Sequence, residues 1–146
     1  MPQHQDGLLD ANSDNFVLFP GDDAAVLNQD WVRRRTRPIN LVIPDGNWRQ
    51  AKRMTYRERD LVGLPRLMLE EGPPSSYRLR RHTNPQCLAT FEAISRALRV
   101  LESASLADEL DHCFRLFVER SLWARGDLDR EAVYGGIPDP ALKPFR

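Results

Sequence analysis

The chain has 146 residues, of which 41% are apolar and 29% charged, and its 21 basic and 21 acidic side chains give a formal net charge of zero. This length suits one compact domain, and apolar runs of no more than about five residues exclude a helix that spans a bilayer. The N-terminus has no basic segment followed by an apolar one, so we expect a cytoplasmic chain with no membrane partner.

Charge is unevenly distributed along the chain. Residues 1–30 carry six Asp and no Lys or Arg, whereas residues 31–84 carry twelve Arg and one Lys against five acidic residues. The planar guanidinium group of Arg suits paired hydrogen bonds to phosphate and stacking on bases. The basic middle third is therefore typical of a nucleic-acid surface, although arginines that merely coat helices would give the same pattern.

The first elements alternate between apolar runs and turns. Residues 16–19 are an apolar run stopped by Pro20-Gly21, which predicts a short buried strand. Asp22 or Asp23 can then cap a helix, which we expect over residues 24–27.

A second β-branched run at residues 39–43 predicts a central strand. Asp45-Gly46 forms the turn after it, and Asn47 can cap the helix that follows. Residues 64–69 predict a third strand, and residues 70–76 have the composition of a loop.

The last third of the chain is predicted to be helical. Asn84-Pro85 offers a start for one helix, and Ser105 with Asp108 resembles a capping box for a second that ends near Arg125-Gly126. The apolar faces of these helices are expected from the spacing of Leu88, Phe91, Ile94, Leu98 and Leu101, and then of Leu106, Leu110, Cys113, Phe114 and Phe117. The Gly- and Pro-containing tail is expected to be extended over the surface or disordered.

Together these elements predict an α/β fold with a mostly parallel sheet and helices on both faces. Residues 1–11 form a flexible end, residues 12–125 the domain, and residues 126–146 the tail. In such sheets ligands bind beyond the carboxyl ends of the strands. The turns at Pro20 and Asp45 and the loop before Ser76 all follow strands, so we expect the pocket there.

Asp45 and Trp48 are the first candidate site residues. A carboxylate in the turn after a buried strand can act as a base or accept a hydrogen bond from a ligand, but it can also merely satisfy the amides of its own turn. The Trp48 indole can stack on a base, although an indole at the start of an amphipathic helix more often packs inward.

A second candidate is the segment of residues 76–82, which interleaves three arginines and a histidine with Tyr77. Fixed guanidinium donors near the start of a helix suit phosphate or carboxylate recognition. The alternative is a solvated basic loop. In the helix that follows, we expect Thr90 and Glu92 on the more exposed side of the first turn, where they can face a ligand.

Cysteine and histidine give no metal site. Cys87 and Cys113 are the only cysteines, and their helix-like contexts predict buried free thiols. With His4, His82 and His112 they form no spacing typical of a zinc site.

Three segments together resemble the DTW-domain family over residues 12–101. Val17-Leu18-Phe19-Pro20 is similar to its strand with a Phe-Pro turn, and residues 44–51 resemble its Asp-x-Thr-Trp element. Residues 64–67, 76–80 and 88–93 resemble the family's closing half. The resemblance implies a fold related to the SPOUT class, with a C-terminal knot that shapes a site for S-adenosylmethionine (SAM).

The resemblance also implies an activity, tRNA-uridine aminocarboxypropyl transfer with SAM as donor. Asp45 would then be the base or the group that orients the uracil. The positions implied around the cofactor are Pro20, Trp48, Leu69, Tyr77, Arg80, Leu88 and Thr90. Arg80 and Arg81 would hold the cofactor carboxylate or a tRNA phosphate. Charge alone assigns the RNA backbone to Arg33, Arg34, Arg35, Arg49 and Arg53.

The sequence departs from the family pattern in three places. Asn47 stands where Thr is usual, and Ala89 stands where Ser is usual. The cysteine-rich zinc-binding segment and first strand of the family are not in the printed sequence, so we expect a shortened member that binds no metal. A catalytically inactive RNA-binding paralogue is the alternative, and a protein-interaction domain is a third.

Overall fold

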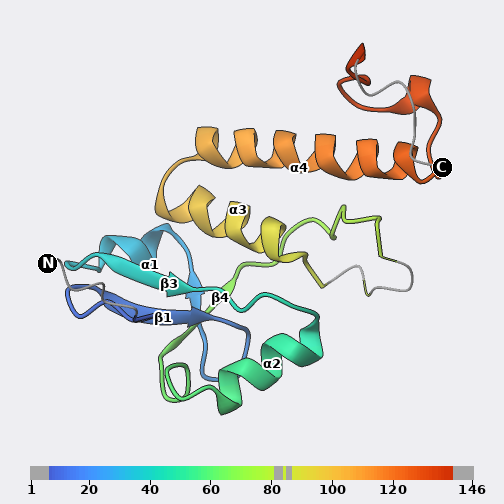
Figure 1. The fold of residues 1–146 in the computed structure, drawn as a ribbon. Coiled ribbons are helices and arrows are strands. Elements are labelled where there is room, and N and C mark those ends of the chain that lie inside the picture. Colours follow the sequence, from blue (N-terminus) through green and yellow to red (C-terminus); the bar gives the residue numbers. More distant parts are fainter. Residues whose placement is uncertain (1–6, 81–83, 85–86, 140–146) are drawn as a thin grey trace, which may run out of the picture. The chain divides into compact units, whose positions relative to one another are not determined.

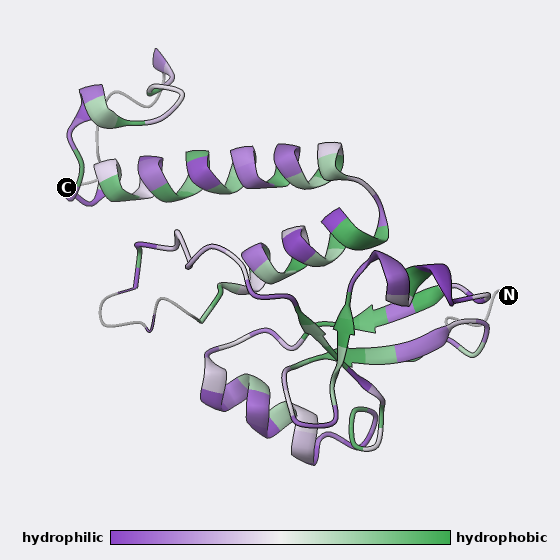
Figure 2. Cartoon of the chain, turned by 180° about the vertical axis from the view of Figure 1, so that it is seen from behind, coloured by the Kyte–Doolittle hydropathy of each residue, from purple (hydrophilic) through white to green (hydrophobic). Residues whose placement is uncertain are grey.

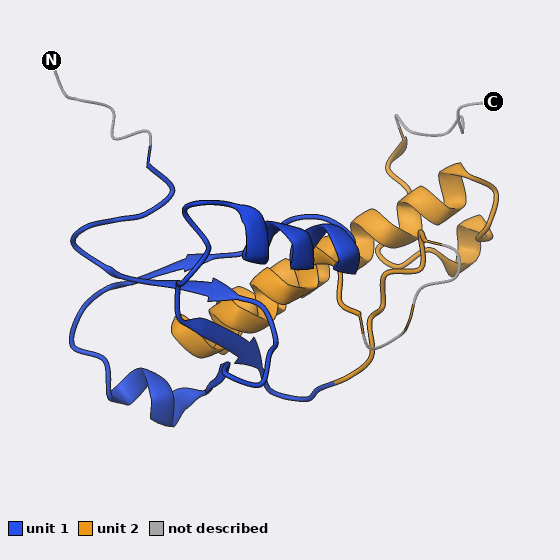
Figure 3. Cartoon of the chain, turned by 90° about the horizontal axis from the view of Figure 1, so that it is seen from below, with its two compact units in different colours: residues 1–72 blue, residues 73–146 orange. Residues whose placement is uncertain are grey.

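The structure is a computed structural model, which describes residues 7–80, 84 and 87–139 (Figure 1). The chain divides into two compact units, the first formed by residues 1–72 and the second by residues 73–146 (Figure 3).

The first unit is built on a four-stranded sheet in which all strands are parallel. Its strands are β1 (Asp14–Leu18), β2 (Ala25–Leu27), β3 (Ile39–Val42) and β4 (Arg66–Leu69), in the order β2-β4-β1-β3. The α/β class with a parallel sheet is confirmed, and strands occur in all three predicted places. The knot that the resemblance implies stays a prediction.

The predicted helix over residues 24–27 is wrong, because this segment is strand β2. Ala25, Val26 and Leu27 pair with β4. Four apolar residues are too few for their spacing to distinguish a helix from a strand, so pairing at the sheet edge decides. The helix begins later, as α1 (Gln29–Arg33), where the Asn28 side chain accepts a hydrogen bond from the Trp31 N–H.

The helices of the first unit, α1 and α2 (Trp48–Arg57), lie on opposite sides of the sheet (Figures 1 and 3). Side chains of an extended strand alternate between its two faces. The Phe16 ring meets Trp31 of α1 edge-on at a centroid distance of 5.0 Å, whereas Phe19 contacts Trp48 of α2 at 4.8 Å. The odd spacing between the two phenylalanines thus gives each face of the sheet one aromatic anchor.

The second unit is a helical hairpin of α3 (Thr90–Leu101) and α4 (Ala104–Ala124), followed by the short 3-10 helix η1 (Arg130–Ala132). The Ser95 hydroxyl donates to the Ala107 carbonyl at 3.2 Å and lies 2.5 Å from an oxygen of Asp111. A small core contains Ala89, Phe114, Val118 and Leu122, against which Tyr77, Leu79 and Leu128 pack. No described helix is long and apolar enough to cross a membrane.

Both predicted helix starts in this unit are shifted. α3 begins at Thr90, because the Glu92 side chain accepts from the Ala89 N–H at 2.8 Å and so caps the helix there, well after Asn84. α4 is capped by Ser103, whose hydroxyl accepts from Leu106 N–H at 3.1 Å, and not by Ser105. Its end at Arg125 agrees with the prediction.

The predicted apolar faces of the two helices are also partly wrong. Phe91, Ile94 and Phe117 are 38%, 37% and 58% exposed. The side chains buried between the helices include the small Ser95 and Ala107, at 1% and 0% exposure. Large side chains also meet between the helices, since Phe91 stacks on the buried Phe114 at a centroid distance of 5.1 Å. Polar and apolar residues alternate along α4 (Figure 2).

The chain after α4 returns along that helix. Val133 is buried, and the Tyr134 N–H donates to Glu119 at 2.6 Å. Arg120 donates to the Gly136 carbonyl at 3.0 Å. Residues 133–136 are thus held against α4.

Candidate functional site

Three of the predicted site residues lie at or just after the ends of neighbouring strands of the first unit. Pro20 comes after β1, Asp45 comes after β3, and Leu69 is the last residue of β4. Since β4, β1 and β3 are adjacent and parallel, their carboxyl ends share one edge of the sheet. The structure therefore brings these three positions to the edge that the sequence predicted.

Local sequence explains the turn that presents Asp45. Gly46 has φ +147°, and a Cβ there would lie 3.0 Å from the Gln50 side chain, so this position requires glycine. Asn47 accepts from the Gln50 N–H while Gln50 accepts from the Asn47 N–H, both at 2.9 Å. This reciprocal cap starts α2 directly after the turn and leaves Asp45 exposed to solvent.

Trp48 is partly exposed to solvent, but its side chain is held by a contact with the sheet. Its indole contacts Phe19 at a tilt of 32°, and yet the residue is 51% exposed. The alternative interpretation of Trp48 as a core residue is therefore wrong. An anchored indole with an open face suits stacking on a planar ring.

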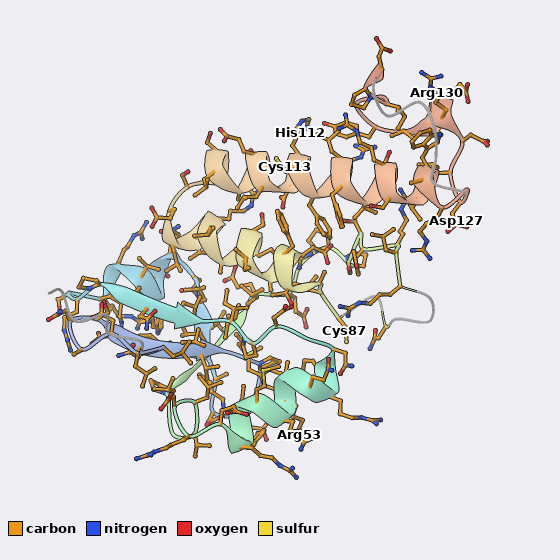
Figure 4. The ribbon with its side chains drawn as sticks, in the orientation of Figure 1. Arg53, Cys87, His112, Cys113, Asp127 and Arg130 are labelled. Carbon is orange, nitrogen blue, oxygen red and sulfur yellow. The ribbon has the colours of Figure 1, made fainter. Side chains whose placement is uncertain are left out.

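The surface of α2 next to this edge is strongly basic. Ala51 and Thr55 are buried, and the remaining side chains are mostly polar, as its purple colour in Figure 2 shows. Its exposed cations are Arg49, Lys52, Arg53 and Arg57, and Figure 4 shows Arg53 on this helix. We call these four residues the α2 basic face.

An aromatic side chain is exposed on the same helix. Tyr56 is 56% exposed, and Arg66 of β4 lies over its ring at 4.3 Å and donates to its hydroxyl at 3.0 Å. Sequence reasoning missed this pair. Helical spacing gives no signal for it, because Arg66 lies on β4, ten residues further along the chain.

Three of the other predicted RNA-contacting arginines are elsewhere in the first unit. Arg33 ends α1 and pairs with Asp30 at 3.2 Å, and Arg35 lies over the Trp31 ring at 4.6 Å. Arg34 is exposed beside them. Because α1 and α2 lie on opposite sides of the sheet, these arginines do not share a surface with Arg49 and Arg53 (Figure 1).

In the second unit, Tyr77 and Arg80 form one local group. Tyr77 stacks on Phe114 with centroids 5.8 Å apart, and the Arg80 guanidinium lies 5.3 Å from the Tyr77 ring. Tyr77 packs against the cluster that contains Ala89. Leu88 and Thr90, the other two predicted residues, are the chain neighbours of Ala89 at the start of α3. Arg81 lies outside the described residues.

Glu92 is buried, which corrects the expectation that it is exposed. It is 7% exposed and accepts hydrogen bonds from the Ser75 hydroxyl at 2.6 Å and from the Ser76 N–H at 2.8 Å. The Ser76 hydroxyl and the Ala89 N–H, at 3.2 and 2.8 Å, complete its partners. Thr90 beside it is half-buried.

A second buried carboxylate, Glu119 of α4, joins the same loop to the returning tail. It bonds Arg115 at 3.0 Å and the Tyr134 N–H at 2.6 Å, and Arg78 is 3.5 Å away. Burial disfavours the charged carboxylate, but the Tyr134 N–H, Arg115 and the charge of Arg78 outweigh it, so the pKa of Glu119 lies below its ordinary value of 4.5. Sequence reasoning missed Glu119, although its spacing from Arg115 is that of a helical ion pair.

The cysteines are not core thiols, contrary to the prediction. Cys113 is exposed on α4 and Cys87 is half-buried (Figure 4). His112 lies 2.8 Å from the Tyr134 hydroxyl, whereas His4 and His82 lie outside the described residues. Within the described ranges, no group of three or more His, Cys, Asp or Glu side chains is placed to hold a metal ion.

Comparison with known proteins gives a match to the DTW domain over residues 1–122. The curated proteins named tRNA-uridine aminocarboxypropyltransferase 2 of Macaca fascicularis and Mus musculus are 30% identical over 97 and 99 residues, which is 66% and 67% of this chain. The protein of that name from Drosophila melanogaster is 33% identical over 88 residues, or 60% of the chain. These matches span only 33% to 34% of the relatives' length. No solved structure matches the chain.

Proposed function

Because the chain belongs to the DTW domain family, we propose that it transfers the 3-amino-3-carboxypropyl group of SAM to N3 of a uridine in tRNA. The relatives' name supports the reaction class. The observation that carries the proposal to this chain's own residues is the exposed carboxylate of Asp45 at the carboxyl edge of the sheet, in the turn before the half-exposed Trp48 and the α2 basic face.

The reaction forms a bond between uracil N3 and the carbon next to the sulfonium of SAM. The bond from that carbon to sulfur breaks, its electron pair goes to sulfur, and methylthioadenosine leaves. The N3 proton must also be removed, which calls for a base within hydrogen-bond reach. Asp45 is our candidate for that base, or for the acceptor that orients the uracil.

The residues present fit the donor by their chemistry. Its carboxylate suits a guanidinium partner, and Arg80 offers one that is already oriented over the Tyr77 ring. Arg81 is proposed for the same role or for a tRNA phosphate. In the first unit, we propose Pro20, Trp48 and Leu69 as SAM contacts, through backbone groups and apolar surface. In the second unit, Tyr77, Leu88 and Thr90 are proposed as SAM contacts separately.

For tRNA, we propose that the α2 basic face binds phosphates close to the reacting uridine. Arg49 and Arg53 belong to this face, and exposed Trp48 and Tyr56 on the same helix can stack on unpaired bases. Arg33, Arg34 and Arg35, on the other side of the sheet, would contact a different part of the RNA. Such contacts predict an affinity that falls steeply with salt.

The test uses the chain with unmodified tRNA and two preparations of SAM, one labelled in the carboxyl group and one in the methyl group. The proposal predicts that only the carboxyl label enters acid-precipitable RNA. Transfer of the methyl label instead would overturn it in favour of a methyltransferase. Salt-sensitive tRNA binding with no affinity for SAM would show the RNA-binding paralogue, which the basic face also supports.

A further inference from the structure

Glu92 connects two segments that are far apart in sequence. Its two carboxylate oxygens divide four donors between them: one accepts from the Ser76 N–H and hydroxyl, and the other accepts from the Ser75 hydroxyl and the Ala89 N–H. At 7% exposure, little water competes for these bonds. The side chain thus ties the Ser75-Ser76 loop to the first turn of α3.

The segments on either side of this tie contain the residues proposed to hold SAM in the second unit. Tyr77 directly follows Ser76, Arg80 comes three residues later, and Thr90 follows Ala89. The loop has further supports, since Arg96 donates to the Pro73 carbonyl at 2.5 Å and Arg125 donates to the Leu79 carbonyl at 3.0 Å. Among these three supporting side chains, only Glu92 bonds both to the loop before Tyr77 and to Ala89, the residue before Thr90.

The chemistry of the site requires a carboxylate. A Gln side chain of the same shape has one acceptor oxygen and one NH2 donor. Whichever way it is turned, the NH2 group would face a backbone N–H, that of Ser76 or that of Ala89. The serine hydroxyls can rotate to accept instead, but a backbone N–H cannot, so one buried donor loses its partner.

We propose that Glu92 is a positioning residue for SAM: by fixing the loop at Ser75-Ser76 to the start of α3, it holds Tyr77 and Arg80 in the arrangement that binds the amino acid end of SAM. This inference rests on the proposed function. It assigns Glu92 no contact with the reacting atoms. It predicts an effect on SAM affinity that exceeds any effect on tRNA affinity.

The test compares Glu92→Gln with Ser95→Ala. Ser95 is a matched control, because it is a polar side chain on α3 that is also buried, and it bonds α4 rather than the loop. Calorimetry with SAM should give a dissociation constant about tenfold to a hundredfold higher for Glu92→Gln, as expected for the loss of a hydrogen bond to a charged group, and one close to wild type for Ser95→Ala. Binding of tRNA should change less than threefold in both.

Hydrogen exchange provides a readout that is independent of SAM. In Glu92→Gln the Ser76 and Ala89 amides should exchange faster, while amides in the middle of α4 should keep their protection. If Glu92→Gln fails to fold, Ser76→Ala replaces it, since that variant removes the hydroxyl donor at 3.2 Å and leaves the Ser76 and Ala89 N–H groups bonded to Glu92. It should weaken SAM binding by a few-fold.

The outcomes separate this inference from the function on which it rests. A wild-type chain that binds no SAM overturns the proposed function and this role with it. A wild-type chain that binds SAM, together with a folded Glu92→Gln chain that binds it equally well, overturns only the role of Glu92. Equal weakening in Glu92→Gln and Ser95→Ala would show a general effect of stability and would also overturn it.

Discussion

The Trp48 indole rests on the Phe19 ring at a centroid distance of 4.8 Å, and this contact joins the first residue of α2 to the residue that follows β1. Phe19 is 5% exposed and Trp48 is 51% exposed. In this pair the Phe19 ring is therefore buried and the Trp48 ring is open to solvent, next to the turn that contains Asp45. This arrangement makes Trp48 a part of the site whose removal should affect function more than stability.

Trp48→Ala should lower the free energy of unfolding by only about 1 kcal/mol, the usual worth of an aromatic pair, because much of the ring is already in water. Transfer to tRNA should fall at least tenfold. Trp48→Phe, which keeps a ring on Phe19, should recover most of the stability and part of the activity. Urea unfolding and the label-transfer assay measure the two effects, and near-normal transfer by a folded Trp48→Ala chain would contradict this role.

Gly46→Ala should destabilise the first unit by roughly 1 to 3 kcal/mol, because a side chain at this φ is strained and its Cβ would also crowd Gln50. Gly63→Ala is the matched control, since its φ of +86° is also positive but nothing lies within 4 Å of the added Cβ. Thermal unfolding should show a larger loss for Gly46→Ala. A smaller loss than in the control would show that the cap of α2 tolerates the contact.

The double variant Arg49→Ala/Arg53→Ala should weaken tRNA binding and reduce the slope of log affinity against log salt by about one to two. The matched control is Arg33→Ala/Arg34→Ala, which removes the same charge from the opposite side of the sheet. Filter binding at several salt concentrations measures the slope. If only the control pair changes the slope, the RNA surface lies on the α1 side.

Stability should depend on pH through Glu119. Because its pKa is lowered in the folded protein, the carboxylate contributes stability above its ordinary pKa, and that contribution is lost as pH falls through the lowered value. The stability difference between wild type and Glu119→Gln should therefore be constant above about pH 5 and shrink in more acid solution. Thermal unfolding from pH 3 to 7 measures it, and a difference that grows in acid would contradict the assignment.

The sequence predicted the parts of the fold that local patterns encode. The apolar runs near residues 16–19 and 39–43 are strands, and Asn47 caps α2 because its partner Gln50 is only three residues away. Residues 24–27 were wrongly predicted, because the pairing with β4 that makes them a strand lies outside any local window.

The candidate site was predictable to a similar extent. Asp45 lies at the carboxyl edge of the sheet because a strand precedes it, which the sequence shows. The burial of Glu92 was not predictable, since its partners Ser75 and Ser76 are 17 and 16 residues away. Nor does a count of charges tell that Arg33 and Arg53 belong to opposite sides of the sheet, because that depends on which face each helix covers.

The most direct test of the central claim is the product formed by wild type and by Asp45→Asn. Each is incubated with SAM and unmodified tRNA, and the tRNA is digested to nucleosides for mass spectrometry. We predict a uridine that carries the aminocarboxypropyl group with wild type and at least a hundredfold less with Asp45→Asn, whose thermal unfolding and SAM affinity should stay close to wild type. Near-normal product from Asp45→Asn would contradict the role of Asp45, and no such product from a folded, SAM-binding wild-type chain would contradict the activity itself.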